Sequence, residues 1–234
     1  MKALLITGTD TDVGKTVLTT ALAAYWQLYY PDKRLGLMKL LQAGTGDRER
    51  YEQLFGANPS ISLVVPLMLQ APLAPPIAAE REEREIDLAV IWQVFSNLVQ
   101  QQDFVFVEAL GGLGSPVTWE LTVADLAGVW RLETVLVVPV RLGAIGQAVA
   151  NVALARQCGV KVRGIVLSCV QPVTPQQLHN WAAIELMRSL TQVPVLGVLP
   201  YLTDLNDLEK LTQVAANLEL ELLNNEWVRL SELP

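Results

Sequence analysis

The sequence "GTDTDVGKT", Gly8 to Thr16, stands near the start of a 234-residue chain and indicates the class of fold. It follows the apolar run "KALLIT" (2–7) and leads into a helical pattern, which is the setting that a phosphate-binding loop requires. In such a loop backbone N–H groups surround an anion, Lys15 neutralises the outer phosphates and the Thr16 hydroxyl binds Mg²⁺. The alternative is a glycine turn that caps a helix, with Lys15 in solvent. The Gly-Lys-Thr ending in this setting favours the phosphate-binding loop.

The loop is one residue longer than the generic one. Five residues separate Gly8 from Gly14, where four are usual, and Thr9 stands where the first glycine is expected. The spacing alone therefore leaves open whether the loop holds a nucleoside triphosphate and what would receive its phosphate.

Outward from the loop, short apolar runs alternate with longer helical patterns. The runs are rich in β-branched residues and almost continuously apolar, which is typical of parallel strands covered on both faces. The alternation predicts right-handed βαβ crossovers, and so a single α/β domain over 1–234 with a mainly parallel sheet flanked by helices. The predicted strands are 2–7, 35–40, 103–109, 134–140, 162–168 and 193–200.

Five segments carry helical patterns, and the last of them opens on Asp207 as an N-cap. Between the second and third predicted strands, 56–86 is rich in proline and then in charge. We expect this segment to be an exposed loop with a solvated helix start, and its length is typical of a functional loop. The predicted helices are 14–29, 87–101, 144–157, 175–190 and 207–223.

Composition limits the partners. The net charge is −7, the pI is about 4.8 and no basic run occurs, which argues against nucleic acid or an anionic membrane surface as a partner. The mean hydropathy is +0.33, yet no stretch approaches 18 uncharged apolar residues, and the N-terminus turns polar too early for a secretory signal. Cys158 and Cys169 have no framework spacing, and a histidine metal site is excluded because His179 stands alone. We expect a cytoplasmic protein.

Three charged residues stand at or near predicted strand ends. Lys39 closes the second strand, Glu108 ends "FVFV" before "GGLGSP", and Asp47 follows the turn "GTG". Ligands of open α/β sheets bind at the carboxyl edge, and an acid after a strand is typical of a magnesium site. A strand-end lysine in solvent is the less favoured alternative for Lys39, whereas Asp47 taken alone is better explained as a helix N-cap. Together Thr16, Asp47 and Glu108 offer the hard oxygens that Mg²⁺ prefers.

The motifs in this order resemble those of the dethiobiotin synthetase family over nearly the whole chain. They are "GTDTDVGKT", Lys39 with "AGTGD" (43–47), "PLAPPIAAERE" (72–82), "VEALGGLGSPV" (107–117), "VVPVRLGAIGQA" (137–148), "GIVLSCVQP" (164–172) and "LGVLPYL" (196–202). The family's own loop also has five residues between its glycines, so the longer loop is a family trait.

The resemblance implies a reaction and a set of roles. The family is a cyclo-ligase of biotin biosynthesis that forms dethiobiotin from 7,8-diaminononanoate, CO₂ and ATP, through a carbamate and a carbamic-phosphoric anhydride. The resemblance also implies that Lys15 and Lys39 are catalytic and that Thr16, Asp47 and Glu108 bind Mg²⁺. It further implies a homodimer in which the segment Leu142–Ile145 of one subunit reaches the site of the other. Transfer of phosphate between two anions needs cations between them, which the lysines and Mg²⁺ supply.

The remaining implied contacts fall into two groups. The nucleotide group comprises Asp12, Val13, Gly14, Lys15, Thr16, Val17, Asp47, Glu108, Ala109, Leu110, Gly111, Ser168, Cys169, Pro200, Tyr201, Leu202 and Asp207. The substrate group comprises Thr11, Asp12, Lys39, Ala43, Leu142, Gly143, Ala144 and Ile145.

Four positions depart from the family pattern. Leu40 replaces the usual proline, and Ala43 replaces a serine or threonine that contacts the carbamate region. The family's usual "EGAGG" reads "EALGG" here, so Ala109 and Leu110 crowd a place where the backbone approaches the ligand. Ser168 stands where an asparagine reads adenine, and a serine cannot make that two-point contact. We therefore expect relaxed nucleotide preference. We also expect Lys39→Ala to abolish ring closure with little loss of fold.

Two other functions compete with the synthetase. One is a nucleotide-binding relative that has lost turnover, which the four departures suggest. The other is a ParA/MinD-like ATPase switch, but "TDTDV" (9–13) lacks the additional loop lysine of those proteins, and the C-terminal stretch 218–234 is acidic where membrane targeting needs a basic helix.

Overall fold

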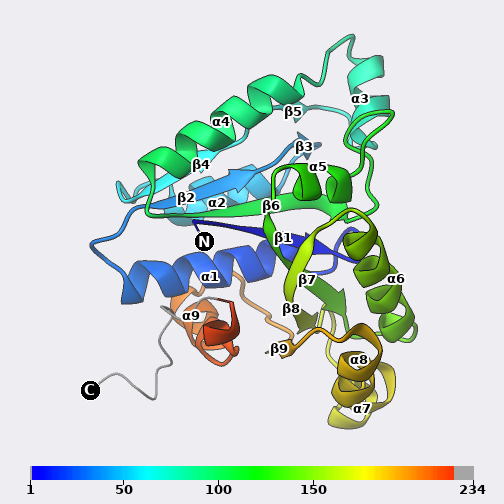
Figure 1. Ribbon diagram of the computed structural model, residues 1–234. Helices are drawn as coiled ribbons and strands as arrows, with labels where there is room; N and C mark the ends of the chain where they lie inside the picture. The colour runs from blue at the N-terminus through cyan, green and yellow to red at the C-terminus, as the bar shows by residue number, and fades with distance from the viewer. Residues whose placement is uncertain (1, 224–234) are drawn as a thin grey trace.

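A seven-stranded parallel sheet forms the centre of the molecule in the computed structural model, which describes residues 2–223 (Figure 1). The α/β prediction is confirmed, and because every strand is parallel, all carboxyl ends meet at one edge. The sheet order is β4-β2-β6-β1-β7-β8-β9, with β1 (Ala3–Gly8), β2 (Leu35–Lys39), β4 (Ile61–Val64), β6 (Phe104–Gly112), β7 (Glu133–Pro139), β8 (Lys161–Ser168) and β9 (Val195–Leu199).

Helices cover both faces of the sheet, since neighbouring residues of β1 pack into different clusters. Leu4 and Ile6 pack with α1, α2 and α9, whereas Leu5 packs with α4 and α5. Figure 1 shows α1 and α9 on one side of the sheet and α4, α5 and α6 on the other. The helices are α1 (Lys15–Tyr29), α2 (Asp47–Phe55), α3 (Pro75–Arg81), α4 (Leu88–Gln101), α5 (Val123–Val129), α6 (Ala144–Gln157), α7 (Pro175–Trp181), α8 (Ile184–Thr191) and α9 (Leu208–Ala216).

The expectation of an exposed loop over 56–86 is wrong for most of the segment, which forms strands and a helix, although its charged end at 80–86 is largely exposed. This segment supplies the edge strand β4 and the strand β5 (Met68–Leu69), which pairs in parallel with β3 (Gln42–Ala43), and then α3. The Glu82 side chain accepts bonds at 2.8 Å from the backbone N–H groups of Gln70 and Ala71 and so ties the turn before α3 to its end. The proline-rich composition suggested a loop, but buried apolar side chains in this segment pack together and hold it in a defined structure.

Two predicted helices are shorter than expected, and α2 and α5 were not predicted as helices. The helix predicted over 175–190 breaks into α7 and α8 because Ala182 and Met187 both turn into one buried cluster. The helix predicted over 207–223 ends at Ala216, because the Glu219 N–H turns back to the Leu196 carbonyl on the edge strand β9. A 3₁₀ turn, Leu220–Leu222, follows. The acidic C-terminal stretch beyond Leu223 lies outside the described residues.

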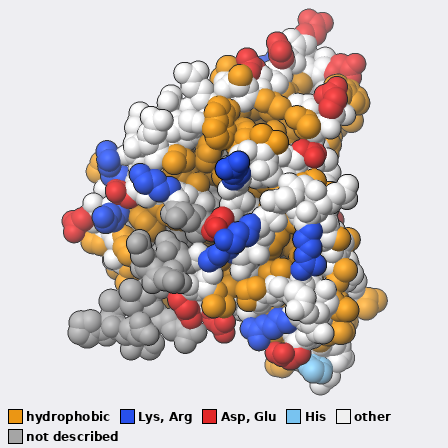
Figure 2. Space-filling model, viewed as in Figure 1, with side chains coloured by type: hydrophobic (Ala, Val, Ile, Leu, Met, Phe, Trp, Pro, Cys, Tyr) orange, Lys and Arg blue, Asp and Glu red, His pale blue; other side chains and the backbone are white. Residues whose placement is uncertain are grey.

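The surface carries its charge unevenly. Figure 2 shows acidic side chains gathered over α3 and the turn after it, while Lys and Arg side chains are scattered on the same face. Within residues 2–223 no helix is long and apolar enough to span a bilayer.

Candidate active site

A cleft of about 990 Å³ opens at the carboxyl edge of the sheet. Its walls come from the ends of β1, β2, β6, β8 and β9 and from the segment before α3. The structure brings most of the predicted site residues together in this one cleft: Thr11, Asp12, Gly14, Lys15, Thr16, Val17, Lys39, Ala43, Asp47, Glu108, Leu110, Gly111, Ser168, Cys169, Pro200, Tyr201 and Leu202.

The phosphate-binding loop depends on two residues with positive φ. Gly14, the N-cap of α1, has φ +97°, and a Cβ there would lie 2.3 Å from the Ser168 hydroxyl oxygen, so only glycine fits. Asp12, within the lengthened part of the loop, has φ +52°, a conformation that aspartate tolerates better than most residues. The Lys15 ammonium donates to the Asp10 carbonyl at 2.9 Å, and burial lowers its pKa.

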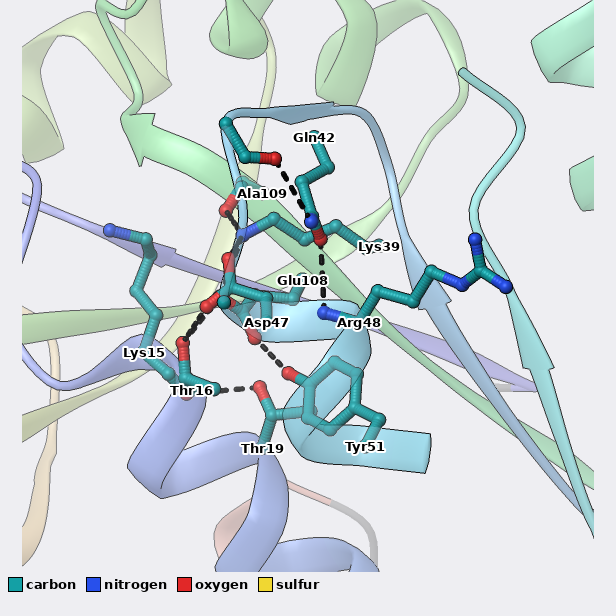
Figure 3. A network of polar contacts seen from close by, with 12 residues as sticks. Lys15, Thr16, Thr19, Lys39, Gln42, Asp47, Arg48, Tyr51, Glu108 and Ala109 are labelled. Atoms are coloured by element: carbon teal, nitrogen blue, oxygen red, sulfur yellow. Dashed lines mark hydrogen bonds and ion pairs between the residues drawn. The ribbon is translucent and has the colours of Figure 1, made fainter. Parts of the chain in front are cut away.

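A network of buried and half-buried side chains joins the residues predicted to bind metal and phosphate (Figure 3). The Thr16 hydroxyl lies 2.8 Å from Asp47 Oδ1 and 2.9 Å from Glu108 Oε1. The Lys39 ammonium lies between the same two carboxylates, 2.8 Å from Glu108 Oε1 and in an ion pair with Asp47. Burial acts to lower the pKa of Lys39, but the carboxylates of Glu108 and Asp47 outweigh it and raise the pKa above its ordinary value. The lysine is therefore a permanent cation.

The burial of Lys39 overturns one expectation. Its side chain is only 5% exposed, so it is not a strand-end lysine reaching solvent. Removing it would leave Glu108, which is fully buried, and Asp47 without their cation. Breaking a buried pair from one side is strongly destabilising, so Lys39→Ala cannot leave the fold untouched.

Sequence reasoning missed Tyr51, which shares this network. Tyr51 lies in α2 one turn after Asp47, is 2% exposed, and its hydroxyl donates to Glu108 Oε2. Burial first and then the Glu108 charge raise the pKa of Tyr51 well above its ordinary value. The available signal was spacing, because residues four apart on a helix share a face.

Asp10 was also missed. Its carboxylate accepts a bond from the Thr11 N–H at 2.8 Å and pairs with Arg141 at 3.3 Å, linking the phosphate-binding loop to the segment before α6. The Thr11 N–H, with further help from Arg141, lowers the pKa of Asp10. Both partners of the ion pair are exposed, so the link is a weak one.

Several predicted residues lie away from the cleft walls. Val13 and Ala109 are buried in the core, although the Ala109 carbonyl accepts a bond from Lys39 at 3.2 Å. Asp207 caps α9 by accepting from the Lys210 N–H, as the N-cap prediction expected. The segment Leu142–Ile145 does not line the cleft, and its first side chain is 83% exposed.

Of the residues that depart from the family pattern, some are buried in the core and others line the cleft. Leu40 is buried, and its N–H donates to the Glu108 carbonyl at 2.9 Å, a bond that proline could not make. Leu110 lines the cleft and packs against buried apolar side chains beneath α3, whereas the Ala109 methyl faces the core. Ala43 offers no hydroxyl to the cleft, and Ser168 lies beside Gly14 at the other end.

The oxygen atoms that converge in the cleft indicate which metal ion the site would bind. Within residues 2–223 no group of three or more His, Cys, Asp or Glu side chains is placed to hold a metal ion. Two carboxylates and one hydroxyl converge instead. This set suits Mg²⁺, which usually takes one or two carboxylates and fills its octahedron with phosphate oxygens and water.

Solved structures with related folds were found at low sequence identity. A ParA family ATPase from Chlorobium tepidum matches with a TM-score of 0.53 at 12% identity, covering 97% of this chain and 93% of the other. A chain of the MinC:MinD cell division protein complex of Aquifex aeolicus matches with a TM-score of 0.58 at 14% identity, covering 97% of this chain and 90% of the other. These likenesses show a P-loop NTPase fold and nothing about activity.

Sequence comparison is more specific. An AAA domain family model matches residues 2–209. Proteins named ATP-dependent dethiobiotin synthetase BioD match at 66% identity in Gloeothece citriformis, covering 95% of this chain and 99% of the relative, and at 55% in Crocosphaera subtropica, covering 95% and 100%. A protein of the same name in Synechocystis matches at 54%, covering 95% and 94%. With most of the motifs lining one cleft and these identities over almost the whole length, the chain belongs to the dethiobiotin synthetase family.

Proposed function

We propose that this chain closes the ureido ring of dethiobiotin from 7,8-diaminononanoate, CO₂ and ATP, releasing ADP and phosphate, as an ATP-dependent cyclo-ligase of biotin biosynthesis. One observation carries the proposal. Lys39 is buried between Asp47 and Glu108, beside the phosphate-binding loop and at the wall of a cleft of about 990 Å³. The 54–66% identity to curated synthetases supports it.

The reaction has three bond-forming steps. One amine nitrogen of the substrate attacks CO₂, loses a proton and becomes a carbamate. A carbamate oxygen then takes the terminal phosphoryl group of ATP, giving a carbamic-phosphoric anhydride and ADP. The second amine attacks the anhydride carbonyl, loses its proton and expels phosphate, which closes the ring.

The two lysines serve the second step. Carbamate and ATP are both anions, so their approach requires preorganised positive charge in a site shielded from water. Lys39 stays protonated because its two carboxylate partners hold it so, and Lys15 projects from the phosphate-binding loop into the same cleft. Both side chains are almost fully buried, which strengthens their attraction for anions.

The hard oxygens of Thr16, Asp47 and Glu108 would hold Mg²⁺. When bound, the ion would add positive charge at the phosphate oxygens.

The substrate end of the cleft would be completed by a second subunit, so we propose a homodimer. Thr11, Asp12 and Ala43 line the cleft near Lys39 and would face the diamine. The segment Leu142–Ile145 opens α6, and its backbone N–H groups could receive a substrate carboxylate. Leu142 is exposed and does not line the cleft of its own chain, which supports a role in the partner's site.

The other end of the cleft would hold the nucleotide base. Ser168, Cys169 and the segment Pro200–Leu202 line it, and we propose that relaxed nucleotide preference follows from the short Ser168 side chain. We further propose that the chain acts in the cytoplasm as one domain, without nucleic acid or a membrane as partner, consistent with its acidic composition.

Dethiobiotin formation by the purified protein with diaminononanoate, bicarbonate, Mg²⁺ and ATP tests the proposal, with Lys15→Ala as the inactive control. Nucleotide binding without turnover would instead indicate a degenerate relative. ATP hydrolysis without dethiobiotin would indicate a switch or another ligation.

Subunit mixing tests the shared site. Lys15→Ala and Ile145→Asp chains, each inactive alone, should regain activity after they are unfolded and refolded together, because the mixed dimer holds one intact site. Absence of recovery, with mixed dimers shown by mass, would contradict a site built from two subunits.

A further inference from the structure

Tyr51 is a core residue whose polar end reaches the active site. Its ring packs in the cluster beneath the sheet with Phe55, and its hydroxyl donates to Glu108 Oε2. Asp47 lies one helical turn earlier on the same face of α2, so the helix approaches Glu108 with both side chains (Figure 3).

The two oxygens of Glu108 have separate partners. Oε1 accepts from Thr16 at 2.9 Å and from Lys39 at 2.8 Å, on the side that faces the cleft. Oε2 accepts from Tyr51, which is its only donor among residues 2–223. The terminal torsion of a glutamate is broad, so contacts on one oxygen leave the plane of the carboxylate poorly fixed. A donor on the second oxygen fixes it.

Burial makes this contact consequential. Glu108 is fully buried and Tyr51 is 2% exposed, so water cannot readily replace the hydroxyl if it is lost. An unsatisfied buried carboxylate oxygen would seek another donor, and the Thr16 hydroxyl and the Lys39 ammonium lie within reach of the same group. Rotation toward them would spoil the arrangement of Oε1.

We propose that Tyr51 is a positioning residue that holds Glu108 with Oε1 directed to Thr16, and so presets the oxygen set offered to a divalent cation. The inference rests on the proposed function, because the cation is the one that accompanies ATP. Helix α2 then serves the site twice, directly through Asp47 and indirectly through Tyr51. The competing explanation is that the Tyr51 hydroxyl only satisfies a polar contact in the core.

The test compares Tyr51→Phe with Tyr25→Phe, a matched loss of a hydroxyl from a buried tyrosine in α1. Electron paramagnetic resonance measures Mn²⁺ binding in the presence of ADP, and dethiobiotin formation is followed across Mg²⁺ concentration. Residues that orient metal ligands typically affect metal affinity or activity 10- to 100-fold. We expect Tyr51→Phe to weaken Mn²⁺ binding at least tenfold and to raise the half-saturating Mg²⁺ concentration in parallel, with KM for diaminononanoate unchanged and Tyr25→Phe like wild type. Unchanged Mn²⁺ affinity in folded Tyr51→Phe overturns the proposal.

A double variant covers the case in which Tyr51→Phe does not fold. Glu108→Gln replaces the carboxylate with a neutral amide, which is less costly to bury without the tyrosine donor. If Tyr51→Phe/Glu108→Gln folds and binds Mn²⁺ no more weakly than Glu108→Gln alone, Tyr51 acts on the metal through the Glu108 carboxylate, as proposed. If it binds Mn²⁺ more weakly than Glu108→Gln alone, or does not fold although Glu108→Gln does, the proposal is overturned. Wild type without dethiobiotin formation would refute the proposed function, and Mn²⁺ binding would still decide the role of Tyr51.

Discussion

The two ends of the cleft are built differently. At the phosphate end, four side chains fix one another through buried and partly buried contacts of 2.8–2.9 Å and an ion pair; they are Lys39, Asp47, Glu108 and Thr16. At the base end, the cleft is lined by Ser168, Cys169, Val170 and the segment Pro200–Leu202, and no charged side chain is among them.

The difference separates chemistry from recognition. A buried charged network tolerates few changes, because removing one member leaves the others unpaired in a medium of low polarity. A wall of uncharged side chains tolerates substitution better, because no buried charge loses its partner when one of them is changed. Changes at the phosphate end should therefore cost both activity and stability, and changes at the base end should alter nucleotide preference alone.

The largest effect is expected for Lys39→Met, which removes the charge and keeps most of the volume. Turnover should fall at least about 100-fold, as when one preorganised charge-stabilising group is lost. The free energy of unfolding should fall by about 3–5 kcal/mol, because Glu108 and Asp47 lose a buried partner. Assays of dethiobiotin formation and urea denaturation measure the two losses.

Lys161→Met is the matched control, since Lys161 is 61% exposed in its pair with Glu133. Its removal should change stability by less than about 1 kcal/mol and leave turnover unchanged. A folded Lys39→Met variant of wild-type stability would show that the buried network does not hold the phosphate end together.

A smaller effect is expected at the base end. Wild type should turn over with ATP, GTP and CTP at comparable rates, and Ser168→Asn should raise kcat/KM for ATP over GTP about tenfold, as one two-point amide contact typically provides. The Ser168 side chain lies against the loop at Gly14, so the longer asparagine must turn toward the cleft. In that orientation the free energy of unfolding should change little.

Ser168→Ala supplies the control, and its nucleotide ranking should match wild type, because the serine makes no two-point contact. A strong preference of the wild type for ATP would contradict relaxed recognition and would assign base reading to another part of the wall.

Much of this fold is predictable because short, continuous apolar runs that alternate with helical patterns are typical of buried parallel strands. Six of the seven strands of the main sheet and the entry into α1 follow from such runs and from the Gly-Lys-Thr ending. The seventh, β4, escapes because it is a short edge strand with only one fully buried residue. Helix α3 was not predicted, because the prolines that precede and open it are as typical of a turn as of a helix start.

The site shows the same division. Lys39 and Glu108 were identifiable because each closes a predicted apolar run, and parallel topology brings such run ends together. Asp47 was identifiable because it follows the "GTG" turn. In the structure Asp47 opens α2, and β6 continues past Glu108 to Gly112.

Tyr51 and Asp10 were not identifiable, because an aromatic residue at helical spacing is usually only core, and a loop aspartate is usually only surface. Helical spacing places Tyr51 on the same face of α2 as Asp47, but the contacts that matter are distant: Tyr51 bonds to Glu108 across 57 residues of sequence, and Asp10 bonds to Arg141 across 131.

The smallest effect is expected for Asp10→Asn, which tests whether charge or burial makes the phosphate end sensitive. The amide oxygen can still accept from the Thr11 N–H, and the ion pair with Arg141 is lost. Because these contacts lower the pKa of Asp10 below its ordinary 3.8, its charge contributes fully above that pH and is lost as pH falls through the lowered value. Asp10→Asn should therefore cost less than about 1 kcal/mol near neutral pH, and the difference from wild type should shrink in acid and in high salt. Urea denaturation as a function of pH and salt checks this. A loss as large as that of Lys39→Met would show that charge near the loop matters even when exposed; a small loss places the sensitivity of this end in its buried pairs.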